Sequence, residues 1–121
     1  MSEQVMTKQE IFDAVVKGLA KQGRPATMPR LRCGDGSRCA IGLLLTDEEI
    51  SGHPVMTCNV AEMNVPARMD VGLHFLDSIQ SAHDYNTGSK DLKGTFQYLR
   101  EVAEDFGLST KAIDEATSGQ G

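Results

Sequence analysis

The segment that decides the fold is residues 30–49, RLRCGDGSRCAIGLLLTDEE. It carries the strongest strand-turn-strand pattern in a chain whose other apolar residues repeat at helical spacing. Asp35-Gly36 is a typical turn dipeptide, and polar and apolar residues alternate on both sides of it. We therefore expect a compact α+β fold that is mostly helical, with one small β-hairpin packed on about three main helices.

Two registers are open to this hairpin. A tight turn would place Cys33 opposite Arg38, whereas a bulged turn with Gly36 left-handed would place Cys33 opposite Cys39. Only the second register gathers the apolar side chains of both strands on one face, and a buried face usually fixes register. We therefore expect both cysteines on the buried side.

The same register collects three arginines on the opposite face, beside small residues. Guanidinium groups bind phosphate and carboxylate well, so this face predicts a seat for a small anionic, nucleotide-like ligand. The simpler alternative is a solvated strand face. A nearby helix end would add hydrogen bonds or stacking. The candidate ligand-binding residues are Arg30, Arg32, Arg38, Gly42, His83 and Tyr85.

Helix signals are clear elsewhere. Capping boxes at Thr7 and Thr46 predict helix starts, and Gly107-Leu108 predicts a left-handed stop. Residues 51–64 show little hydrophobic periodicity, which predicts a loop. The expected helices span residues 7–22, a short stretch after Thr46, 64–85, 92–106 and 109–116.

Composition limits the remaining possibilities. The 121 residues, 40% of them hydrophobic, fit one domain over 1–121, with 1–6 and 117–121 frayed. No apolar run is long enough for a membrane span, so we expect a cytoplasmic protein with reduced cysteines. The net charge of −5 divides into +4 over residues 8–38 and −9 over the rest. That division favours a small anion or an acidic partner and disfavours general DNA binding.

A catalytic alternative rests on Gln80-x-x-His83-Asp84, at the end of the third expected helix. With Cys39 these residues would form a Cys-His-Asp arrangement of a small hydrolase. A metal phosphohydrolase would instead need the set His53, His83, Asp84 and Asp105. The structural alternative is that His83 and Asp84 bond to backbone groups of the hairpin or a loop. The cysteine spacing matches no zinc motif, and we expect no metal and no cofactor.

Residues 102–113 have the spacing of a helix-turn-helix, with Gly107 in the turn. The charge argues against DNA reading, because Asp114 and Glu115 would stand where phosphates or bases are met. Nucleic acid is therefore an unfavoured partner.

The chain resembles a family of small, uncharacterised proteins encoded by bacteriophages and prophages. The resemblance runs from about residue 9 to residue 108. It is carried by Gln9-Glu10-Ile11-Phe12-Asp13, Cys39-Ala40-Ile41-Gly42, Asp47-Glu48-Glu49, Gln80-x-x-His83-Asp84, Leu99-Arg100-x-Val102-Ala103 and Phe106-Gly107-Leu108.

The resemblance implies a phage accessory protein in the cytoplasm of a bacterial host. Because such proteins often counter host defence, it implies an inhibitor or a sequestering protein. The expected function is therefore a non-enzymatic host-defence antagonist that binds an anionic, nucleotide-like ligand or a host protein. No membrane partner is expected, and a homo-oligomer remains open.

Overall fold

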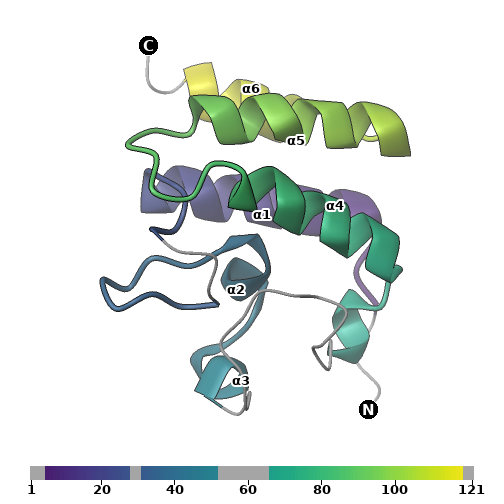
Figure 1. The fold of residues 1–121 in the computed structure, drawn as a ribbon. Helices are drawn as coiled ribbons and strands as arrows, with labels where there is room; N and C mark the ends of the chain where they lie inside the picture. The colour runs from purple at the N-terminus through teal and green to yellow at the C-terminus, as the bar shows by residue number, and fades with distance from the viewer. Residues whose placement is uncertain (1–4, 28–30, 52–65, 119–121) are drawn as a thin grey trace.

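The computed structural model describes residues 5–27, 31–51 and 66–118, and these residues fold into helices arranged in three tiers (Figure 1). The middle tier holds α1 (Lys8–Gln22) and α4 (Leu73–Asp84). On one side lie α5 (Lys93–Phe106), against α4, and α6 (Lys111–Ser118), against α1. On the other side α2 (Ala40–Leu44) packs on both middle helices, with α3 (Asp47–Ser51) beyond it.

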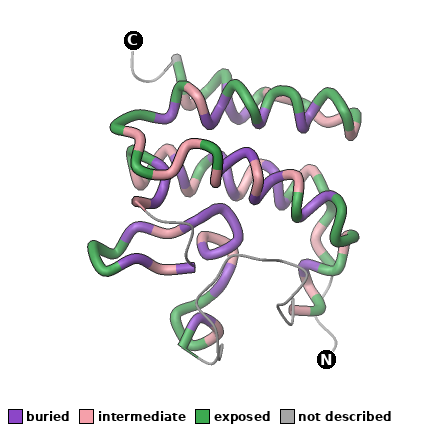
Figure 2. The backbone as a smooth tube through the Cα atoms, viewed as in Figure 1, coloured by how far each residue is buried: buried purple, intermediate pink, exposed green. Residues whose placement is uncertain are grey.

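The helix α1 begins and ends as its sequence predicts. The Thr7 hydroxyl accepts a hydrogen bond from the Glu10 amide at 3.0 Å, and the Glu10 carboxylate accepts one from the Thr7 amide at 2.8 Å. Gly23 ends the helix in the left-handed region, with φ 86°. The predicted capping box is confirmed. The apolar side of α1 lies at the centre of the core, as Figure 2 shows.

The expected β-hairpin is wrong, and so is the α+β fold class. Its turn forms: the Cys33 amide donates to the Ser37 carbonyl at 2.8 Å, and Gly36 has φ 88°. No strand follows the turn within the described residues, because Cys39 begins the helix α2 instead of pairing with Cys33. The Ser37 hydroxyl and amide bond to the Asp35 carboxylate, which lowers its pKa below the ordinary value.

A helix forms here instead of the expected strand because the first backbone amides of α2 find hydrogen-bond acceptors. The Cys39 sulfur accepts from the Gly42 amide at 3.3 Å, and the Gln80 side chain, from α4, accepts from the Ile41 amide at 3.0 Å. Free backbone amides at a helix start need acceptors. Here the acceptor for the Ile41 amide belongs to Gln80, 39 positions further along the chain. An alternating pattern in a short apolar run cannot reveal such a partner.

The remaining elements agree with prediction except at the boundaries of two helices. The helix expected over residues 109–116 is α6 (Lys111–Ser118), so residues 117 and 118, expected to be frayed, belong to it. The capping box at Thr46 starts α3, and Gly107 ends α5 with φ 67°. The helix expected from residue 64 instead begins at Leu73, after a 3-10 turn, η2 (Ala67–Met69), and after Gly72 at φ 105°. A φ in that region interrupts a right-handed helix and suits glycine. The loop expected over 51–64 lies outside the described residues beyond residue 51.

Candidate functional site

The structure places Arg32 and Arg38 together, but on a carboxylate of the chain itself. A guanidinium nitrogen of Arg32 lies 3.4 Å from Oδ1 of Asp47, and Arg38 bonds to the same oxygen. Arg38 also donates to the Leu45 carbonyl at 3.2 Å. Arg30, the third predicted arginine, lies outside the described residues.

Gly42 has a packing role. A Cβ atom at this position would lie 2.0 Å from the carbonyl oxygen of Leu31, so any side chain would force the backbone apart. The residue is buried and presents no surface to a ligand. The Cys-Ala-Ile-Gly sequence therefore encodes a helix cap, two core side chains and one close backbone approach.

The Gln80-x-x-His83-Asp84 motif forms a hydrogen-bond network that joins three segments. Gln80 accepts from the Ile41 amide of α2 and donates to Asp84 Oδ1 at 2.6 Å. His83, fully buried, accepts at Nε2 from the Ala26 amide at 2.9 Å. Its Nδ1 therefore carries the proton and faces Asp84 Oδ1 at 3.1 Å. The His83 bond matches the structural alternative, in which the motif serves backbone groups, whereas the printed contacts of the Asp84 carboxylate are to the side chains of Gln80 and His83.

The same bonds weigh against the catalytic alternative. The Cys39 sulfur is fully buried and accepts a helix amide, while Nε2 of His83 is already occupied by the Ala26 amide. A general base needs a free nitrogen within reach of the thiol. For the metal alternative, the described part of the chain holds no group of three or more histidine, cysteine, aspartate or glutamate side chains that could bind an ion. His53 lies outside it.

Tyr85 follows the last residue of α4 and contacts α5. The residue is 76% exposed, and its ring stacks on that of Tyr98, which is 43% exposed; the ring centroids are 5.5 Å apart and the planes differ by 26°. Two exposed tyrosines held ring to ring form a preorganised aromatic surface. The five predicted ligand-binding residues that the structure describes therefore do not form one site.

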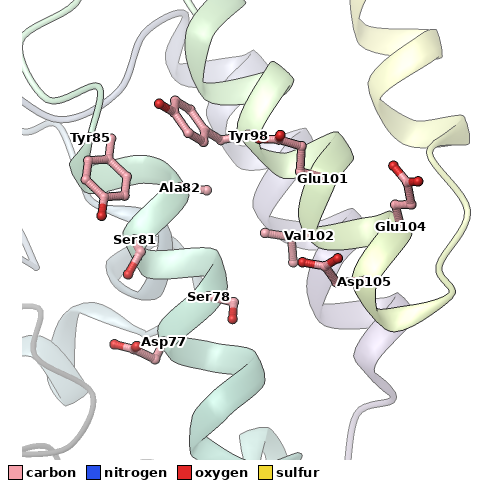
Figure 3. A pocket seen from close by; sticks show the side chains of 10 residues that line it. All are labelled: Asp77, Ser78, Ser81, Ala82, Tyr85, Tyr98, Glu101, Val102, Glu104 and Asp105. Carbon is pink, nitrogen blue, oxygen red and sulfur yellow. The ribbon is translucent and has the colours of Figure 1, made fainter.

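The tyrosine pair stands at one end of a groove between α4 and α5, of about 510 Å³ (Figure 3). Buried Ala82 and Val102 lie at its base. In this view Asp105 and Ser78 point into the space between the helices, whereas Asp77 projects from the side of α4 away from α5 and Glu104 projects toward α6. We call this feature the acidic groove; it is lined by Asp77, Ser78, Ser81, Ala82, Tyr85, Tyr98, Glu101, Val102, Glu104 and Asp105.

Charge is the dominant property of the acidic groove. Its four carboxylates are exposed, and none of them makes an ion pair within residues 5–27, 31–51 and 66–118. Among the residues that the structure describes, no lysine or arginine lines it. A volume of this size lies within the range of about 300 to 1,000 Å³ typical of ligand pockets. Carboxylates beside exposed aromatic faces suit a cationic guest.

Comparison with known proteins adds no family. The chain matches no protein-family model, no curated protein and no solved structure. The acidic groove therefore has no counterpart from which a ligand can be transferred, and its chemistry alone has to indicate one.

The helix-turn-helix spacing leads to a different surface. Ala112 and Ile113 of α6 are buried, and Gln9 of α1 bonds to both backbone groups of Ser109. Asp114 of α6 pairs with Arg100 at 2.8 Å, and the Glu115 carboxylate lies 3.9 Å from the Lys111 ammonium group. Exposed carboxylates at these positions are unfavourable for DNA phosphates. In addition, no helix in the described ranges is long and apolar enough to cross a membrane.

The acidic groove was not predicted from the sequence. Taken singly, each of its carboxylates has the sequence pattern of a solvated helix face. Tyr85 was assigned to the predicted arginine site, and its pairing with Tyr98 was not predicted. The available signal was Tyr98-x-x-Glu101-x-x-x-Asp105, which places an aromatic and two acids on one side of α5. Only the packing of α4 on α5 shows that this side faces Tyr85.

Proposed function

We propose that the protein is a small, non-enzymatic, phage-encoded accessory factor that binds a basic segment of a host protein in the acidic groove. The observation that carries the proposal is the coincidence of two features. Four carboxylates that make no ion pair with any described residue line the same groove as an exposed, stacked tyrosine pair. The resemblance of the sequence to phage proteins supports a host partner in the bacterial cytoplasm.

Electrostatics selects the sign of the partner. Four carboxylates around one groove repel one another, and a lysine or arginine side chain relieves that repulsion as it enters. Because the groups are exposed, the attraction is strong only at low ionic strength; at physiological salt, charges more than about 8 Å apart are largely screened. The field therefore steers a basic segment to the groove, and short-range contacts must hold it there.

The tyrosine pair supplies such a short-range contact. A guanidinium or ammonium group over the free face of Tyr85 or Tyr98 gains about 0.5–1 kcal/mol at an exposed site. An arginine gains more than a lysine, since its planar group also stacks and can bond to a carboxylate through two nitrogens. We therefore expect the groove to prefer arginine.

A labelled arginine-rich peptide tests the proposal by fluorescence anisotropy. Changing Glu101→Gln together with Asp105→Asn should weaken binding roughly three- to tenfold. The charge-matched control, Glu48→Gln with Glu115→Gln, removes two exposed carboxylates elsewhere and should leave binding nearly unchanged. Equal losses in the two variants would show that the peptide responds to net charge and would refute a site in the groove.

A second pair of variants separates aromatic recognition from charge. Tyr85→Leu with Tyr98→Leu keeps apolar bulk at both positions and removes the ring faces. It should cost about two- to fivefold in peptide affinity, with the salt dependence preserved. An unchanged affinity would mean that the tyrosine pair takes no part.

A further inference from the structure

A second site stands on the opposite side of the middle tier, where Arg32 and Arg38 meet Asp47. Both guanidinium groups contact a single oxygen, Oδ1 of the carboxylate, at 3.4 Å for Arg32 and at shorter range for Arg38. The Asp47 side chain is 73% exposed. Two cations therefore converge on a position that solvent and solutes can reach.

Arg38, which lies closer to Asp47 than Arg32 does, is held in place by neighbouring segments. The backbone of Arg38 is clamped by the Gln22 side chain, which accepts from the Arg38 amide at 2.8 Å and donates to its carbonyl at 3.1 Å. The Arg38 guanidinium also donates to the Leu45 carbonyl at 3.2 Å. A preorganised guanidinium loses less freedom when it binds an anion.

The carboxylate, in contrast, is free to leave. Thr46 and Glu49 form the cap of α3, and Asp47 takes no part in it. The Asp47 carboxylate is exposed, so water solvates it as its side chain rotates away. An entering phosphate takes over the contacts of Arg38, whose side chain is only 23% exposed. Two guanidiniums that have lost their shared carboxylate bind phosphate oxygens well.

We propose that Arg32 and Arg38 form a binding site for the phosphate group of a small ligand, and that Asp47 occupies this site as a built-in competitor. A phosphate group enters as the carboxylate rotates out, and its several oxygens contact both arginines at once. The site lies on different elements from the acidic groove and does not depend on the function proposed for it.

Inorganic pyrophosphate at constant ionic strength is a suitable probe. Asp47→Asn removes the competing charge, and the variant should bind pyrophosphate about fivefold more tightly than the unmodified chain. Glu48→Gln is the matched control, because it removes the same charge one position along the same helix from a side chain with no ion pair in the described residues. It should change affinity less than twofold.

Two measurements test whether Asp47 competes with a phosphate group for Arg32 and Arg38. Isothermal titration calorimetry should give a gain for Asp47→Asn that disappears when Arg32→Ala is added to it. Arginine side-chain NMR signals should shift on titration for Arg32 and Arg38. The proposal is overturned if Asp47→Asn binds no more tightly than Glu48→Gln, or if the shifting signals belong only to other arginines.

Discussion

Lowering the pH tests the ion pair that joins α3 to η2. Both carboxylate oxygens of Glu49 accept hydrogen bonds from the Arg68 guanidinium, at 2.7 and 2.5 Å. These bonds lower the pKa of Glu49 from 4.5 to about 2. Because the folded pKa is depressed, the stabilisation is complete above pH 4.5 and is lost as the pH falls toward 2.

The size of this effect follows from the pKa. A fall from 4.5 to about 2 corresponds to an upper bound of about 3 kcal/mol in the free energy of unfolding. The Glu49 and Arg68 side chains are 27% and 20% exposed, so solvent screens part of it. We expect about 1–2 kcal/mol at neutral pH.

Urea denaturation of the unmodified chain and of Glu49→Gln between pH 7 and pH 3 measures the effect. Glutamine keeps the capping box of α3 but carries no charge. The stability difference should be about 1–2 kcal/mol at pH 7 and should shrink steadily below pH 4.5. The control Glu48→Gln should stay close to the unmodified chain throughout. A difference between the unmodified chain and Glu49→Gln that does not change with pH would refute this reasoning.

Three further predictions test the packing around α2. Gly42→Ala should destabilise the protein by about 3 kcal/mol in urea, because its Cβ would meet the Leu31 carbonyl; a loss below about 1 kcal/mol would contradict that contact. Gln80→Leu should cost about 2 kcal/mol and speed hydrogen exchange at the Ile41 amide, which would lose its acceptor; unchanged exchange would show that another group accepts from this amide. Native Cys39 should resist a neutral alkylating reagent, as peptide mapping by mass spectrometry would show; rapid labelling would reopen a nucleophilic role.

The sequence predicted those parts of the fold that local chemistry determines. The capping boxes at Thr7 and Thr46, the left-handed stop at Gly107 and the turn at Gly36 depend on residues within a few positions of one another. Each of these features appears in the structure.

The sequence-based predictions were wrong where residues distant in the sequence determine the local structure. The five residues of α2 are too few to show a helical period, and the Ile41 amide depends on Gln80 from a different helix. The arginine site was assembled on a strand face that does not form. Tyr85 and Tyr98 meet only because α4 packs on α5, so their groove could not be read from either helix alone.

Chemical-shift mapping with an arginine-rich peptide tests whether the acidic groove binds a basic segment. In a ¹⁵N heteronuclear correlation spectrum, we expect the shifts to concentrate on the facing sides of α4 and α5, with Tyr85, Tyr98 and Asp105 among the largest. The amides around Arg38 and Asp47 should stay unmoved. Shifts spread evenly over the acidic surface, or absent from the groove, would contradict the claim that it is a binding site for a basic segment.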